Sequence, residues 1–326
     1  MPAKGIWTIG NVIKMIREEQ GISLEQLSYG LCSVSTLSRI ENEEREMNIL
    51  FFMILFGRLG YYPDKYEFYG SKEEYEQYEQ RALIQTYQKG EKYKQMILEL
   101  EQYKEEWAED ILKDSLQQQF VDSMEGFLLV HEKKYDEGIK LLKRAVEKTI
   151  PNWDELWYEK LIIGEQELNI MNILADGFEM SGEEEHAYQL RKHIYIYLEQ
   201  RKIERLQVLQ LYTTIICKMV PWVIKCSNLG QALVLCNDGI QAIAKRGRLY
   251  HLGELLYWKA QCLEELYHVG KEPKEDYLDI YWRAYYIFRL EQNEEMSEKI
   301  KLILDKEEPE WESIRLEKLL KEPEKV

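Results

Sequence analysis

Residues 9–45 decide the fold of this chain, and they read IGNVIKMIREEQGISLEQLSYGLCSVSTLSRIENEER. The first apolar residues have the spacing of one face of a helix: Ile9, Val12, Ile13 and Ile16. Gly21 ends this run, and Ser23 with Gln26 forms a capping box that predicts the start of a second helix. Ser33 is the predicted N-cap of a third helix. With a fourth helix over residues 48–59, the segment has the layout of a helix-turn-helix domain.

At the residue level this segment resembles the helix-turn-helix of the phage-repressor (Xre/Cro) type. That family has an Arg in helix 1, a Ser at the start of helix 2 and an Ile-Glu pair at the end of helix 3, and the matching residues here are Arg17, Ser23, Ile40 and Glu41. The resemblance implies that Arg17 and Glu41 pair across the bundle and lock helix 1 onto helix 3. A bidentate Arg–carboxylate bond supplies the physical reason.

The resemblance also implies which residues contact DNA. The residues expected at or beside the base edges are Val34, Ser35, Ser38 and Arg39, and the phosphate candidates are Arg45 and Lys14. Arg39 is the one long donor near the bases, and it suits the O6 and N7 acceptors of guanine. The alternative is that this helix face and both cations are ordinary solvated surface.

Three glutamates near the end of the third helix depart from the family pattern. Glu43 stands where the family usually has a Gly that closes the helix at positive φ, and Glu44 and Glu46 follow it. Residues 1–70 contain seven Lys or Arg and nine Asp or Glu. We therefore expect weak DNA binding per monomer, so that a homodimer on two half-sites is needed.

Composition places the whole chain among helical, soluble proteins. The 326 residues carry a net charge of −16, most of it beyond residue 70, with 45% hydrophobic residues and only 7 Pro and 18 Gly. No segment reaches the ~20 apolar residues of a membrane-spanning helix, and no secretory signal is visible at the N-terminus, which predicts a cytoplasmic protein without a membrane partner. The five cysteines show no CxxC spacing and are interpreted as reduced core residues.

Beyond residue 70 the sequence predicts paired amphipathic helices. Small residues that let two helices approach recur 12 residues apart, as Gly126 with Gly138 and Ala175 with Ala187. This spacing resembles the tetratricopeptide repeat (TPR), although successive units lie further apart than the 34 residues of a regular repeat. We expect an all-α chain with a helix-turn-helix domain over residues 1–69 and a TPR-like right-handed solenoid over 70–326. The solenoid should contain about five hairpins and a capping helix at 311–320.

No signature of catalysis, metal binding or cofactor binding is apparent in the sequence. The five histidines form no HExxH motif, and His186 with His193 offers only two ligands on one helix face. No Gly-rich phosphate loop and no GxSxG motif is present. We therefore expect that the protein is not an enzyme and has neither a metal site nor a cofactor.

An Xre-type head followed by helical repeats resembles the peptide-sensing (PlcR/Rgg/PrgX-like, RRNPP) regulators of Gram-positive bacteria. The resemblance implies a transcriptional regulator whose solenoid mediates dimerisation and binds a short signalling peptide or a protein partner in its groove. Side-chain amides hold the peptide in that group, and the corresponding groove candidates on one helix face are Asn169, Asn172, Asp176 and Glu179. Two alternatives remain open. The two asparagines can be plain surface residues, and an acidic head can belong to a repeat scaffold that no longer binds DNA.

Overall fold

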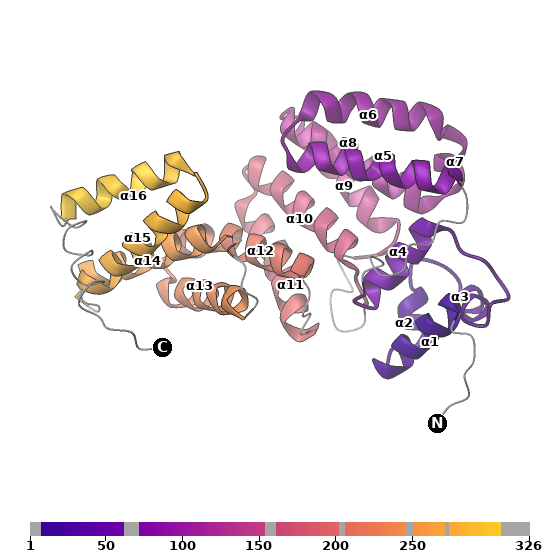
Figure 1. Cartoon of the computed structure of the whole chain (residues 1–326), viewed down its shortest axis with the longest axis horizontal. Coiled ribbons are helices and arrows are strands. Elements are labelled where there is room, and N and C mark those ends of the chain that lie inside the picture. Colours follow the sequence, from indigo (N-terminus) through magenta and orange to yellow (C-terminus); the bar gives the residue numbers. More distant parts are fainter. Residues whose placement is uncertain are drawn as a thin grey trace. The chain divides into compact units, whose positions relative to one another are not determined.

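The computed structural model describes residues 8–61, 72–153, 161–201, 206–245, 249, 251–270 and 274–307. The described residues form sixteen helices and no strand (Figure 1), so the predicted all-α fold is confirmed. The backbone contacts divide the chain into two compact units, Met1–Ile203 and Glu204–Val326. The predicted domain boundary after residue 69 falls inside the first unit and stays a prediction.

The head consists of four short helices, α1 (Ile9–Glu19), α2 (Leu24–Ser28), α3 (Val34–Glu41) and α4 (Ile49–Arg58). The predicted caps are present, because the Ser23 side chain accepts from the Gln26 amide and the Ser33 side chain accepts from the Thr36 amide. Side chains from all four helices meet in one core, which includes Ile13, Leu27, Leu37 and Phe52. Ile162, from beyond the head, completes that core.

Three helix pairs follow the head in the first unit. They are α5 (Lys72–Lys89) with α6 (Tyr93–Glu106), α8 (Ser115–His131) with α9 (Tyr135–Glu147), and α10 (Glu165–Met180) with α11 (Glu184–Arg201). The short helix α7 (Ala108–Lys113) connects the first two pairs and was not predicted. These pairs coincide with the hairpins that the sequence predicts.

Gly126 and Gly138 explain how closely α8 and α9 pack. A Cβ atom on Gly126 would lie 2.7 Å from the Cγ atom of Leu142, and one on Gly138 would lie 3.0 Å from the carbonyl oxygen of Gly126. Either distance is too short for a side chain without a shift of the neighbour. The small residues are therefore required by the approach of the two helices, as their spacing predicted.

The second unit contains five helices, α12 (Leu206–Lys225), α13 (Leu229–Ala244), α14 (Leu252–His268), α15 (Lys274–Leu290) and α16 (Glu294–Glu307). Each of these helices contacts the next one along the chain, and α12 also contacts α14. Helix α16 was not predicted. The predicted capping helix at 311–320 lies outside the described residues.

Helix α12 continues through Pro221 to Lys225. It corrects the expectation that no segment is long and apolar enough to cross a membrane, since Val208–Lys225 passes that test by length and composition. In the structure 61% of this window is buried, so α12 serves as a core helix of its unit.

Candidate functional site

Helix α3 presents a polar, exposed first turn. Ser33 caps it from an extended conformation, which leaves Val34 (37% exposed) and Ser35 pointing away from the core, while Leu37 and Ile40 are buried. Arg39 lies on the same outer surface, with its side chain 59% exposed, and Ser38 is half-buried. The structure therefore brings the predicted base-contacting residues to one accessible face.

Arg17 and Glu41 form the ion pair that the sequence predicts. Arg17 donates from Nε to Glu41 Oε1 at 2.6 Å and from Nη2 to Glu41 Oε2 at 2.8 Å, and both side chains are buried. Arg17 Nη1 also donates to the carbonyl of Ile22 at 3.0 Å, which ties the pair to the start of α2. The hydrogen bond to Glu41 raises the pKa of Arg17 further above its ordinary value. This pair has a structural role inside the head.

The acidic residues after α3 have two effects, because Glu43 closes the helix and Glu44 pairs with Arg39. Glu43 adopts a φ of 63°, and the amides of Glu43 and Glu44 donate to the carbonyls of Ile40 and Arg39, which completes a Schellman cap without a glycine. The Glu44 carboxylate lies 3.8 Å from Arg39 Nε. Glu44 therefore pairs with the guanidinium that the sequence predicts at a base edge.

The two predicted phosphate candidates lie in different environments. Arg45 is exposed and its Nη1 atom is 3.4 Å from Thr36 Oγ1, a weak contact that leaves the guanidinium accessible. Lys14 is half-buried on α1. Glu46, directly after Arg45, is exposed as well. Arg45 is the better placed of the two cations to meet a phosphate.

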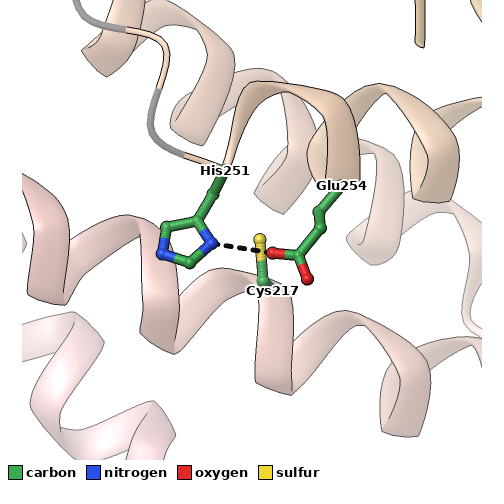
Figure 2. Close-up of side chains that lie close together, drawn as sticks. All are labelled: Cys217, His251 and Glu254. Carbon is green, nitrogen blue, oxygen red and sulfur yellow. Dashed lines mark hydrogen bonds and ion pairs between the residues drawn. The ribbon is translucent and has the colours of Figure 1, made fainter. Parts of the chain in front are cut away.

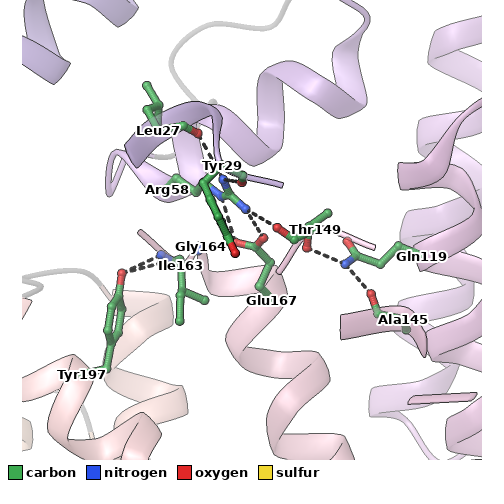
Figure 3. Close-up of polar contacts among 10 residues, drawn as sticks. All are labelled: Leu27, Tyr29, Arg58, Gln119, Ala145, Thr149, Ile163, Gly164, Glu167 and Tyr197. Carbon is green, nitrogen blue, oxygen red and sulfur yellow. Dashed lines mark hydrogen bonds and ion pairs between the residues drawn. The ribbon is translucent and has the colours of Figure 1, made fainter. Parts of the chain in front are cut away.

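A buried arginine joins the head to the repeats. Arg58, the last residue of α4, donates to Glu167 of α10 at 2.8 Å (Nη2 to Oε1) and 3.3 Å (Nε to Oε2), and each side chain is 1% exposed (Figure 3). The remaining N–H groups of Arg58 donate to the carbonyls of Leu27, Tyr29 and Thr149. All five guanidinium N–H groups therefore have an acceptor.

The surroundings of Arg58 extend this junction on both sides. Glu167 Oε2 also accepts from the Gly164 amide at 2.7 Å, so the same carboxylate caps α10. Gly30, at a φ of +71°, packs so closely that a Cβ atom would lie 1.9 Å from the Thr149 carbonyl oxygen. The Tyr29 hydroxyl donates to the Pro151 carbonyl at 3.1 Å. The head is thus fixed to the α9–α10 segment by polar contacts that require close approach.

This junction was not predicted from the sequence, although one signal for it was visible. Residues 49–59 are the most apolar stretch of the chain, and Arg58 interrupts them. A charge inside an otherwise buried helix needs a partner in the interior. The partner, Glu167, is 109 residues away, so only the fold identifies it.

The predicted groove residues of α10 divide into two groups. Asn169 is exposed, whereas Asn172 is buried and its Oδ1 atom has no hydrogen-bond partner. Asp176 and Glu179 each accept from Nη2 of Arg191, a fully buried side chain of α11, at 2.6 Å. These two carboxylates are therefore engaged in holding α10 to α11. Of the four residues, Asn172 is the one with a buried polar atom that has no partner.

Arg191 itself has unused hydrogen-bonding capacity. Its Nε–H group is buried and has no acceptor, although Nη2 is bound by two carboxylates. An unpaired buried donor or acceptor costs about 1–3 kcal/mol. The α10–α11 pair therefore contains one unpaired acceptor, on Asn172, and one unpaired donor, on Arg191. A peptide bond offers the complementary N–H and C=O groups.

Comparisons with known families and structures agree with the fold. Residues 13–65 match the helix-turn-helix family, and residues 158–308 match the RNPP family C-terminal domain. No curated protein matches the chain. The fold is similar to that of PlcR from Bacillus thuringiensis in complex with the peptide PapR7 and DNA, with 20% identity and a TM-score of 0.54 over 90% of this chain and 98% of that one. It is also similar to apo PlcR, with 19% identity and a TM-score of 0.52 over 90% and 97% of the chains.

Proposed function

We propose that this chain, which belongs to the RNPP family of helix-turn-helix regulators, is a cytoplasmic transcriptional regulator that binds DNA as a homodimer. Its first unit would bind DNA through α3, and its repeats would bind a regulatory peptide or protein. The observation that carries the proposal is that one helix, α10, holds both Glu167, which fixes the head, and Asn172, which has an unused acceptor. The similar PlcR structure contains both a peptide and DNA.

In this reading Arg39 supplies the specific DNA contact, with Ser35 and Val34 beside it. Leaving Glu44 costs little, because an ion pair between exposed side chains contributes only about 0–1 kcal/mol. Binding guanine O6 and N7 contributes about 1–3 kcal/mol of discrimination. Transfer of the Arg39 guanidinium from Glu44 to a guanine therefore lowers the free energy, but the loss of the ion pair with Glu44 reduces the free energy gained on DNA binding.

On the repeat side, the ligand would be an extended peptide segment. Its backbone N–H would donate to Asn172 Oδ1, and a backbone carbonyl would accept from Arg191 Nε, which removes two unpaired buried groups. Asn169, exposed on the same helix, offers an amide that both donates and accepts. Asp176 and Glu179 would act indirectly by holding Arg191 in place.

The DNA-binding part is tested by selecting genomic fragments with the full chain at low and moderate salt. We expect an enriched sequence, and we expect Arg39→Ala to weaken its binding by about 5- to 150-fold. Arg283→Ala is the matched control, because its side chain is 58% exposed, nearly the same as the 59% of Arg39, and it also has an acidic partner. An absence of any enriched sequence, or equal losses for both variants, favours the scaffold that does not bind DNA.

The ligand part is tested by measuring thermal stabilisation of the chain by a peptide that binds it. Such a ligand raises the melting temperature by mass action on the folded state. Asn172→Ala should reduce the shift, and Asn293→Ala is a control, because Asn293 caps α16 in the second unit. An unchanged shift for Asn172→Ala would remove this residue from the site.

A further inference from the structure

Three side chains that can bind metal ions meet in the second unit. Cys217 lies within α12, while His251 directly precedes α14 and Glu254 is in its first turn (Figure 2). His251 Nδ1 and Glu254 Oε2 are 2.7 Å apart, and the ligand atoms of all three residues lie within 4.8 Å of one another. Cys217 is more than 30 positions before His251 and Glu254 in the sequence, which is why the spacing of cysteines and histidines did not reveal the cluster.

The surroundings of His251 orient its ring as a metal ligand requires. Its Nε2 atom is 3.0 Å from Thr214 Oγ1, and that hydroxyl donates its one proton to the Gln210 carbonyl at 2.8 Å. With a metal ion on Nδ1, Nε2 would carry the ring hydrogen and donate it to Thr214, whose own proton goes to Gln210. Nδ1 is the nitrogen that faces Glu254 and Cys217. A ligating histidine commonly donates its second ring N–H to a neighbouring acceptor, which fixes the ring and its tautomer.

The ligand set selects the class of metal ion. A thiolate with an imidazole and one carboxylate suits Zn²⁺, whereas Mg²⁺ and Ca²⁺ prefer oxygen ligands alone. Three protein ligands leave one position of a tetrahedral zinc site for water or an external ligand. The buried Cys217 is reached from the side of His251 and Glu254, whose side chains are 29% and 46% exposed.

We propose that Cys217, His251 and Glu254 form a mononuclear Zn²⁺ site that ties α12 to α14. Zn²⁺ displaces the proton on the thiol and the hydrogen on Nδ1, and the carboxylate turns from that hydrogen to the ion. The bound ion replaces the His251–Glu254 hydrogen bond at the start of α14 by a link between α12 and α14, which α13 separates in sequence. This site is independent of the DNA-binding and peptide-binding proposals, since both of those rest on residues of the first unit.

The experiment is a Co²⁺ titration of the chelator-treated full chain, followed by competition with Zn²⁺. We expect one equivalent of Co²⁺ to produce a thiolate-to-cobalt charge-transfer band and the visible bands of a tetrahedral site. Cys217→Ser should abolish the charge-transfer band. His251→Gln should weaken Zn²⁺ binding at least about tenfold, since even the loss of a group that hydrogen-bonds to a metal ligand lowers the affinity by that factor. Mg²⁺ should not compete.

Two control variants test whether binding is specific to this cluster. Cys226→Ser removes an exposed cysteine just after α12, and His268→Gln breaks another His–Glu pair of the same unit that has no cysteine within its cluster. Neither should change the spectrum or the affinity. The proposal is overturned if no stoichiometric site forms, or if the charge-transfer band survives Cys217→Ser. Equal melting temperatures of the wild type and Cys217→Ser, both measured in chelator, show that the variant is folded. If Cys217→Ser is less stable, His251→Gln decides the test, because His251 is partly exposed and its replacement disturbs the core less.

Discussion

Glu167→Gln is expected to loosen the head from the repeats while leaving both folded. The substitution keeps the shape of the side chain but removes the charge that faces Arg58. Glu167 Oε1 and Oε2 accept from Arg58, and Oε2 also accepts from Gly164. A Gln amide supplies only one acceptor oxygen, so at least one of these donors loses its partner whichever way the amide is turned.

The size of the effect follows from the burial of the pair. Removing one partner of a buried ion pair costs about 3–5 kcal/mol, because the remaining charge lies in the interior without compensation. Arg58 keeps the carbonyls of Leu27, Tyr29 and Thr149 as acceptors. We therefore expect the lower end, about 3 kcal/mol, which corresponds to roughly a 150-fold larger opening equilibrium of the junction.

Hydrogen exchange of the backbone amides of α2 in the full chain measures this opening directly, without assuming that a chain of two units unfolds in one step. Glu109→Gln is the matched control, because its ion pair with Lys113 is exposed (88% and 71%) and should contribute at most about 0.5 kcal/mol. In the pair Arg58→Leu and Glu167→Leu, the double variant should lose less stability than the sum of the single variants. An effect of Glu167→Gln no larger than that of Glu109→Gln would refute the assignment of the junction to this pair.

Three further variants test local features of the chain. Glu43→Gly should raise the free energy of unfolding of the head by about 1 kcal/mol, since a residue at a φ of 63° is strained unless it is glycine; a lower melting temperature would contradict this. Gly138→Val should lower the stability of the first unit by about 1–3 kcal/mol in urea denaturation, because its Cβ atom would lie 3.0 Å from the Gly126 carbonyl oxygen. Lys274, through a hydrogen bond, holds the pKa of Glu307 below its usual range, so the pair stabilises the fold above the ordinary carboxyl pKa and loses this contribution as pH falls through the lowered pKa. Lys274→Met should therefore reduce the stability lost between neutral and acidic pH, by less than about 1 kcal/mol in acid titration of the melting temperature.

The sequence predicted those features of the head that depend on residues close together in the chain. Ser23 and Ser33 cap their helices through hydrogen bonds to amides three residues ahead, and the spacing of apolar residues then fixes which side is buried. Even Glu43 was identified as the residue at a helix end that normally takes glycine, and its positive φ agrees with that position. These signals depend on residues close together in the sequence, so they can be recognised without knowledge of the fold.

The contacts between distant helices were not predicted, for a reason that Asp176 illustrates. Its position on a face of α10 was inferred from repeat spacing, but its partner Arg191 comes from the next helix, and spacing within one helix does not identify it. The same holds for Glu167, whose partner lies in the head, and for Cys217, whose neighbours lie on α14. A pattern along one helix indicates a face, whereas the chemistry of that face depends on what packs against it.

The strength of the junction bears on how a ligand of α10 can act on the head. Glu167 and Asn172 lie on one continuous helix, so a displacement of α10 that pairs Asn172 with a ligand also moves the carboxylate that holds Arg58. A ligand shifts the head only by the difference between its affinities for the two arrangements. Coupling energies of this kind are about 1–3 kcal/mol, and the cost of about 3 kcal/mol expected for Glu167→Gln lies at the upper end of that range. The junction is therefore strong enough to define one arrangement of the head and weak enough for a ligand to displace it, and Glu167→Gln should make DNA binding by the full chain insensitive to that ligand.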